Sequence, residues 1–143
     1  MRVSEVLASK GSDAIFTISP DASIRELLDV LADRNVGAMI VSDDGETMIG
    51  IVSERDVVRK LRDVDNAREV TVASIMTTDV QVAGPEDSFT SLMLAMTEHR
   101  VRHIPVLDDG RLVGVLSIGD AVKHRMEQLE FERDQLNKYV SGG

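Results

Sequence analysis

The sequence contains no cysteine among its 143 residues. This absence excludes a disulfide-stabilised scaffold, thiolate-ligated metal sites and cysteine nucleophiles, and it fits a cytosolic protein. Aromatic residues make up only 3% of the chain, so a folded core must be built from aliphatic side chains and methionine. No apolar run is long enough to span a bilayer or to serve as a signal peptide. We therefore expect a soluble, cytoplasmic protein.

Basic residues are also scarce. The chain has 16 Lys and Arg against 25 Asp and Glu, which gives a formal net charge of −9. General nucleic-acid or anionic-membrane binders need a basic face, so we expect neither partner, although a local basic pocket for one small anion is still permitted. Apolar residues make up 43% of the chain, enough for one ordinary domain or for two half-sized units that share a core.

One short motif occurs twice in this chain. Residues 50–56 read Gly-Ile-Val-Ser-Glu-Arg-Asp, and residues 114–120, which lie 64 positions later, read Gly-Val-Leu-Ser-Ile-Gly-Asp. In each copy, a short apolar run that ends in serine predicts a strand entering a helix. Such a junction brings backbone N–H groups, a hydroxyl and a carboxylate to one point, which suits a sugar-phosphate ligand.

The elements around the motif recur as well. In the first copy we expect a short helix at 3–9, a strand at 15–18, a helix that starts within residues 20–23, a hairpin at 36–52 and a helix that opens at Ser53. The apolar face of the helix after Pro20 is formed by Ile24, Leu27, Leu28 and Leu31. In the second copy the same patterns predict a short lead-in at 72–76, a strand at 80–82, a helix after Pro85 and a strand at 101–107. A period of about 65 residues shared by every type of element predicts one pseudo-symmetric unit.

The chain ends in a helix predicted from about residue 118 to residue 140. Its apolar residues follow two heptad positions, one with Val122, Leu129 and Leu136 and the other with Met126, Arg133 and Val140. This is a coiled-coil seam interrupted by an arginine; the alternative is a helix that lies on its own domain or on a partner. We expect repeat 1 at 1–62, a linker at 63–71, repeat 2 at 72–125 and a C-terminal helical extension at 126–143.

This order of elements, taken twice, resembles a tandem cystathionine-β-synthase (CBS) domain pair, or Bateman module, of the small stand-alone bacterial type. Both motifs fit the family pattern Gly-apolar-apolar-Ser/Thr-x-x-Asp, residues 102–106 fit its second-strand pattern and residues 75–77 its lead-in. The resemblance covers residues 1 to 125. It implies an α/β fold of the α+β type, with two repeats packed through their small sheets, two clefts between them, and disc-shaped homodimers. Such clefts commonly bind AMP, ADP, ATP, NAD(H) or S-adenosylmethionine.

The motif residues are the first candidate ligand contacts. Asp56 and Asp120 suit a ribose, because a carboxylate has two acceptor oxygens for the two donors of a cis-diol. Ser53 and Ser117 stand at helix starts, where the hydroxyl and free N–H groups can meet phosphate. The alternative is a capping box, which satisfies the helix end without any ligand. The two roles can coexist.

Basic residues are the second group of candidates. Arg55 opposes the dipole of its own helix, so an anion nearby would explain it better than solvation alone. Arg100 and Arg102 can share one face of a strand, next to His103. The alternative interpretations are a solvated charge, a charged strand start and a structural histidine.

The first repeat has Gly37 and Ala38 where the second has Arg102 and His103. In CBS pairs similar to the nucleotide-sensing subunit of AMP-activated protein kinase, the basic pair of one repeat faces the phosphate held in the other repeat's cleft. That resemblance implies a strong phosphate site around Asp56. It also implies a weaker cleft around Asp120, facing residues without side-chain charge.

The same resemblance implies that the backbone at Thr17, Ile18, Thr78 and Val80 lines the adenine pockets. No Gly-rich phosphate loop, histidine cluster or nucleophile elbow is present, so we expect neither an enzyme nor a metal site. The sequence therefore predicts a regulatory homodimer that binds an adenine nucleotide and acts on an unknown regulated protein, with S-adenosylmethionine as an alternative ligand. The competing hypothesis is a structural or interaction protein with empty or vestigial clefts.

Overall fold

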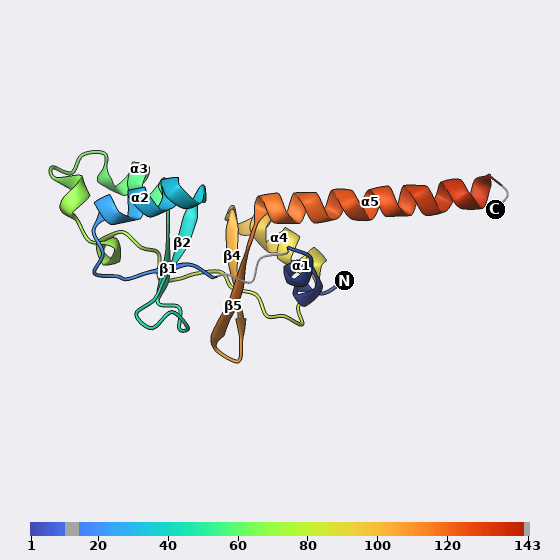
Figure 1. The fold of residues 1–143 in the computed structure, drawn as a ribbon, viewed down its shortest axis with the longest axis horizontal. Helices are drawn as coiled ribbons and strands as arrows, with labels where there is room; N and C mark the ends of the chain where they lie inside the picture. Colours follow the sequence, from blue (N-terminus) through green and yellow to red (C-terminus); the bar gives the residue numbers. More distant parts are fainter. Residues whose placement is uncertain (11–14, 142–143) are drawn as a thin grey trace.

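The computed structural model describes residues 1–10 and 15–141, which form two α/β repeats lying side by side (Figure 1). The first repeat contains, in chain order, β1 (Thr17–Ile18), α2 (Ile24–Arg34), β2 (Ala38–Val41), β3 (Gly50–Ser53) and α3 (Glu54–Leu61). The second contains α4 (Phe89–His99), β4 (His103–Asp108), β5 (Arg111–Ser117) and α5 (Ile118–Val140). The remaining elements are α1 (Val3–Ser9) and two short 3-10 turns, η1 (Ala67–Glu69) and η2 (Val72–Ser74). The predicted fold class, with a long C-terminal helix, is confirmed.

The first helix of each repeat begins and ends in the same way. The hydroxyl of Ser23 accepts the N–H of Glu26 at the start of α2, and the hydroxyl of Ser88 accepts the N–H of Ser91 at the start of α4, as helix N-caps do. Both helices end at a residue in the left-handed conformation. The two repeats therefore share local geometry as well as sequence.

The two sheets differ by one strand. In the first repeat β1 pairs with β2 in parallel, and β2 pairs with β3 in antiparallel register. In the second, β4 and β5 form an antiparallel pair, and the strand predicted at 80–82 is wrong: only Ala83 forms a parallel bridge, opposite Val106. A longer ladder would need an N–H at Pro105, which proline lacks. The equivalent residue of the first repeat, Ile40, keeps that donor.

Each repeat has its own aliphatic core, and each core takes in a segment from the far side of the linker. Val3 and Val6 of α1 are buried in the second core, among Phe89, Leu92, Ile104 and Leu116. Val72 and Ile75 are buried in the first core, among side chains of α2, β2 and β3. Backbone hydrogen bonds fix both lead-ins, from Val3 to Asp87 and from Val72 to Ala22, each at 2.8 Å. The packing thus crosses the repeat boundaries that follow the chain.

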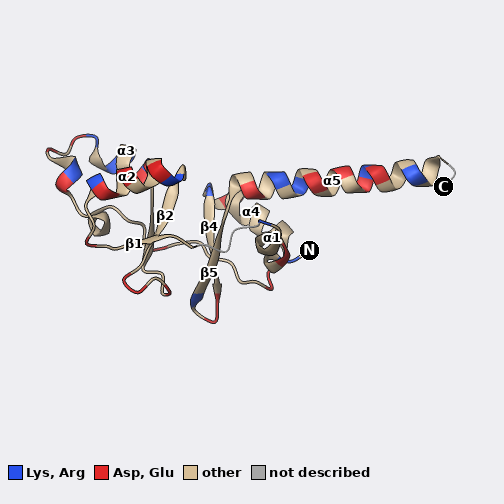
Figure 2. Ribbon diagram, viewed as in Figure 1, with Lys and Arg blue, Asp and Glu red and all other residues tan. Residues whose placement is uncertain are grey.

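The last helix, α5, starts against β5 and then runs well past the rest of the molecule (Figure 1). Acidic and basic residues alternate along its length (Figure 2). Ala121 near its start is buried, whereas Met126, Leu129 and Leu136 are exposed. Among the helices of the described residues, none has the length and apolar character needed to cross a bilayer.

The motif glycines mark where the exchanged segments press against the sheets. A Cβ added to Gly50 would lie 2.8 Å from the carbonyl oxygen of Thr77, whereas one added to Gly114 would meet the end of the Leu7 side chain at 2.7 Å. Backbone cannot move aside as a leucine methyl can. We therefore expect Gly50→Ala to lower the free energy of unfolding by about 1–3 kcal/mol, the usual cost of overpacking.

The matched variant Gly114→Ala should cost clearly less, since a change of the Leu7 rotamer can absorb the added methyl. Urea unfolding of both variants measures the difference. Equal costs would show that the backbone contact at Thr77 is no tighter than the side-chain contact at Leu7.

Candidate functional site

A cleft of about 630 Å³ opens between α3 of the first repeat and the start of β4 in the second. We call it the Asp56 cleft. Its polar and charged lining residues come from three stretches of chain: Ser53, Glu54, Arg55, Asp56, Arg59 and Lys60; Thr77, Asp79 and Gln81; and Arg100, Arg102 and His103. Gly37, Ala38 and Val80 line it as well. The structure therefore brings together nine of the residues singled out from the sequence.

The charge of the Asp56 cleft is opposite in sign to that of the chain. Five of its lining residues are basic and three are acidic, an excess of two positive charges with histidine neutral, whereas the whole chain carries −9. A concave site with low-dielectric walls concentrates such a local field. The cleft is thus suited to one small anion in a protein that repels anions elsewhere.

The carboxylate of Asp56 is held in place by its own helix end. Its Oδ2 accepts the backbone N–H of Ser53 at 2.9 Å and the Ser53 hydroxyl at 3.1 Å. The Ser53 hydroxyl in turn accepts the N–H of Asp56, which completes a capping box. The other oxygen, Oδ1, lies 3.4 Å from the ammonium of Lys60 at the cleft. The structural role foreseen for the motif is therefore present, and it leaves Oδ1 turned toward a cation instead of the backbone.

Arg100 has a backbone conformation that glycine and asparagine adopt more readily than arginine does. It ends α4 with φ of 54° and ψ of 40°, in the left-handed region, where the first repeat has Asn35. Asparagine tolerates this region, whereas most side chains are disfavoured there by about 1–2 kcal/mol. Strained backbone tends to collect at functional sites. The strain at Arg100 lies at the Asp56 cleft.

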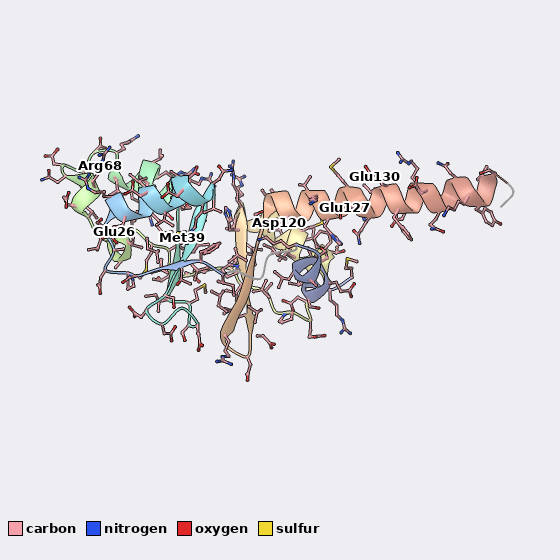
Figure 3. The ribbon with its side chains drawn as sticks, in the orientation of Figure 1. Glu26, Met39, Arg68, Asp120, Glu127 and Glu130 are labelled. Atoms are coloured by element: carbon pink, nitrogen blue, oxygen red, sulfur yellow. The ribbon has the colours of Figure 1, made fainter. Side chains whose placement is uncertain are left out.

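A second cleft of about 590 Å³ is lined by residues of both repeats. We call it the Asp120 cleft. Its lining residues come from α1 and Lys10 after it, the stretches leading into β1 and β2, strands β2 and β3, the two strands of the second repeat and the start of α5; among them are Lys10, Phe16, Gly37, Ala38, His103, Ser117 and Asp120. Figure 3 labels Asp120 where α5 leaves the module. Ser117 and Asp120 form a second capping box, with the Ser117 N–H donating to Asp120 at 2.9 Å.

Gly37 and Ala38 line this cleft, as the sequence analysis expected, but a cation that it did not anticipate reaches Asp120. The ammonium of Lys10 lies 3.1 Å from Oδ2 of Asp120 and donates to the carbonyl of Val115 at 2.8 Å. Burial alone would raise the pKa of Asp120, but hydrogen bonds from Ser117 and Lys10 outweigh it and lower that pKa. Asp120 is therefore an ionised carboxylate that already forms an ion pair with Lys10. Lys10 reaches this position because α1 packs on the second repeat.

His103 lines both clefts, as do Gly37 and Ala38. Burial lowers the pKa of His103 below its ordinary value; the negative charge of Asp120 opposes this effect, while the cations Lys10 and Arg102 add to it. The imidazole is therefore neutral at pH 7. A neutral ring can accept or donate a hydrogen bond on the wall between the two clefts.

Three residues expected at the adenine pockets, Thr17, Ile18 and Thr78, are not among those that line the two clefts. Their neighbours in the sequence do line the clefts. Ile15 and Phe16 line the Asp120 cleft, and Thr77, Asp79, Val80 and Gln81 line the Asp56 cleft. Ile18 is instead buried in the first core. The assignment of the adenine pockets to the backbone of these residues stays a prediction.

The sequence analysis also missed several charged residues at the clefts. Arg59 and Lys60 lie three and four residues after Asp56, one helical turn on, and this spacing could have identified them. Lys10 has no such local signal, since its place in the Asp120 cleft depends on the exchange of α1. No group of three or more potential metal ligands occurs in the described part of the chain.

Two α/β repeats that enclose two clefts, each with a Ser-x-x-Asp helix start, define a tandem α/β module. The family model of the CBS domain matches residues 3–63 and 72–127. The chain thus belongs to the CBS domain family. It is 34% identical over 149 residues to the mitochondrial CBS domain-containing protein CBSX3 of Arabidopsis thaliana, spanning 99% of this chain and 72% of that protein.

Solved structures show the same fold. The CBS-domain containing protein ATU1752 from Agrobacterium tumefaciens is 36% identical with a TM-score of 0.81, over 87% of this chain and 99% of that one. The CBS domain protein PAE2072 from Pyrobaculum aerophilum, complexed with AMP, is 28% identical with a TM-score of 0.72, over 84% and 89%. The CBS pair of MJ0100, in complex with 5-methylthioadenosine and S-adenosyl-L-methionine, shares the fold at 22% identity and a TM-score of 0.77, over 90% and 98%.

The lowered pKa of His103 predicts how stability depends on pH. The unfolded chain, with an ordinary histidine pKa of about 6.5, takes up the proton before the folded protein does. The contribution of His103 is therefore fully present above about pH 6.5 and is lost as the pH falls toward the folded-state pKa. The His103→Gln variant should show a shallower loss of unfolding free energy than the parent between about pH 7 and 5.

The matched control is His99→Gln, at the exposed last turn of α4, which should keep the slope of the parent protein. Urea titrations at four or five pH values give the slopes. A His103→Gln slope identical to that of the parent would show that burial does not penalise the protonated ring.

Proposed function

We propose that this protein is a regulatory sensor of an adenine nucleotide, AMP, ADP, ATP or NAD(H), that works without catalysis as a cytoplasmic homodimer on a partner protein. The observation that carries the proposal is the Asp56 cleft: a concave, locally basic site in an acidic chain, with an oriented carboxylate at a helix start. A nucleotide needs these features together, since its ribose requires acceptors and its phosphates require cations.

In the proposed complex, the ribose diol donates to Asp56. Oδ2 is already engaged in the capping box, so the oxygen available to a diol is mainly Oδ1, which faces Lys60. The phosphates lie toward Arg100 and Arg102, with Arg55 and the helix start at Ser53 as further contacts. Hydrogen bonds to charged groups contribute about 1.5–3 kcal/mol each, so two or three of them would give useful affinity.

The Asp120 cleft is proposed as the weaker site. A ribose there must compete with Lys10 for Asp120, and the displaced ammonium would become the main cation available to a phosphate. Phe16, whose ring stacks under the guanidinium of Arg34 at 3.5 Å, offers an apolar surface for a base. This cleft is thus better suited to the adenosine part of a ligand than to a chain of phosphates.

The comparisons support an adenosine ligand in general terms. One CBS relative was solved with AMP and one pair with 5-methylthioadenosine and S-adenosyl-L-methionine. The charge of the Asp56 cleft favours a phosphate-bearing ligand over S-adenosylmethionine, which carries a positive sulfonium. The Asp120 cleft, with fewer cations, is the place where the methylated ligand would compete best.

Nucleotide titrations of Asp56→Ala and Asp120→Ala test the proposal. The parent protein, stripped of bound ligand, should be stabilised by at least one of AMP, ADP, ATP and NADH; a ligand at 100 times its Kd adds about 2.7 kcal/mol. Asp56→Ala should weaken the tighter binding phase about tenfold or more, because the ribose loses its acceptor, while the cations that hold the phosphates keep the binding dependent on salt. Asp120→Ala should leave that phase unchanged.

Each variant needs a fold check by circular dichroism, because loss of a cap costs about 1 kcal/mol by itself. The two aspartates cap equivalent helices, so each variant is the stability control of the other. Absence of any stabilisation by the nucleotides would favour the alternative, an interaction protein with vestigial clefts. Equal losses in both variants would contradict the ranking of the clefts.

The strain at Arg100 allows function and stability to be separated. Arg100→Asn, which copies the first repeat, should raise the unfolding free energy by up to about 1 kcal/mol, because asparagine tolerates the left-handed conformation. The same change removes a cation from the Asp56 cleft and should weaken nucleotide binding several-fold. Thermal unfolding and titration on the same samples measure both effects.

Asn35→Arg is the reciprocal control: it places the strain in the first repeat, at the Asp120 cleft, and should lower stability. Stabilisation of Arg100→Asn without any loss of affinity would remove Arg100 from the phosphate site.

A further inference from the structure

The exposed seam of α5 is a surface that neither cleft uses. Four apolar residues in its two heptad positions are about half exposed or more: Val122 at 51%, Met126 at 56%, Leu129 at 48% and Leu136 at 64%. The helix continues beyond the module as a rod, with Glu127 and Glu130 labelled along it in Figure 3. Its apolar row therefore lies in water for most of its length.

The contacts of α5 with its own module lie on a different side of the helix. Ala121 is buried there, the His124 ring packs edge-on against Phe89 at 5.0 Å, and Gln128 contacts Met1. At about 100° per residue, these three positions centre roughly 130° away from the row of Val122, Met126 and Leu129. The module and a partner can therefore occupy α5 at the same time.

We propose that α5 pairs with α5 of a second copy of this chain, in antiparallel orientation and in one register. In that register Met126 faces Leu129 of the partner subunit, and the reverse contact is made by symmetry. Gly119 faces Leu136 of the partner subunit, so the smallest residue of the seam receives a large side chain. Arg133 lies opposite Val122 of the partner subunit, where its aliphatic stem packs and its guanidinium reaches water.

The flanking charges select this register. In an antiparallel coiled coil, residues at the positions beside the seam face the same position of the partner helix. Here Lys123 faces Glu130 of the partner subunit, and Arg125 faces Glu132 of the partner subunit. Symmetry repeats both contacts, so all four charged flanking pairs join opposite charges. This charge complementarity is what identifies a second copy as the occupant.

The neighbouring arrangements are worse on the same criterion. A shift by one heptad toward the C-terminus sets Glu130 against Glu130 and Glu132 against Glu132 of the two subunits. A shift the other way sets Lys123 against Lys123 and Arg125 against Arg125. A parallel pair sets Arg133 against Arg133 inside the seam. Each of these places like charges face to face, which destabilises the pairing.

This pairing deepens the homodimer part of the proposed function and is independent of nucleotide binding. It gives the dimer a defined geometry, because the two modules lie at opposite ends of the helix pair instead of pairing face to face as in the disc-shaped dimer that the family resemblance implies. The tip of each α5 then reaches the start of the partner's α5, close to the Ser117–Asp120 helix start of the Asp120 cleft. The dimer contact and the weaker cleft thus adjoin one another.

Cysteine cross-linking without nucleotide tests the proposal, and the chain has no cysteine of its own. An equal mixture of Met126→Cys and Leu129→Cys chains, one carrying a mass tag, should form a mixed disulfide dimer on mild oxidation. The two Cα atoms must lie within about 7 Å for the bond to form. Phe131→Cys, exposed on the opposite side of α5, is the matched control and should not cross-link with Met126→Cys.

Charge reversal tests the register. E130K/E132K should weaken the dimer about tenfold or more, seen as dissociation at higher protein concentration and as a lower disulfide yield. K123E/R125E should do the same, whereas an equal mixture of these two variants should pair, because every flanking contact is again between opposite charges.

Two results would overturn the proposal. Self-linked Met126→Cys dimers in place of the mixed disulfide would show a parallel pair. A dimer of twice the 15.7 kDa chain mass by light scattering, with no mixed disulfide, would show that another surface forms the dimer. In either case nucleotide titration of the same samples still decides the sensor function separately.

Discussion

The fold depends on the exchange of two short lead-in segments across the linker. Val3 and Val6 close the core of the second repeat, and Val72 and Ile75 close the core of the first. Neither repeat could bury its apolar surface alone, since small domains bury too little of their chain to be stable. The exchange makes the pair one cooperative unit, and it fixes the separation of the sheets between which both clefts form.

Both clefts are lined by carboxylates and hydroxyls that also stabilise the starts of helices. In both repeats an aspartate closes a capping box with the serine three residues before it. This fixes the orientation of the carboxylate before any ligand arrives, so little side-chain entropy is lost on binding. The two sites differ in which cation attends that carboxylate. Lys60 belongs to the same helix as Asp56, whereas Lys10 comes to Asp120 from the far end of the chain.

The fold was largely predictable from the sequence because local sequence patterns identify most elements of its repeat. The doubled motif and the period of about 65 residues gave the elements and their order. The strand at 80–82 failed because a single missing N–H, at Pro105, lies on a neighbouring strand rather than in the segment itself. The Asp56 cleft was largely predictable as well, since most of its charged residues stand in two short stretches. Lys10 was not, because no local pattern shows that α1 packs on the opposite repeat.

The crossing of the lead-ins also bears on what the linker does. The stretch from Arg62 to Asn66 joins the repeats covalently, but the contacts that hold them together lie elsewhere, at Val3 with Asp87 and at Val72 with Ala22. A chain cut in this stretch would yield two fragments, each carrying the segment that completes the other. The two fragments would bind each other through these exchanged segments. The module is therefore a natural split protein. Insertions, tags or protease sites placed between Arg62 and Asn66 do not interrupt the contacts that hold the two repeats together.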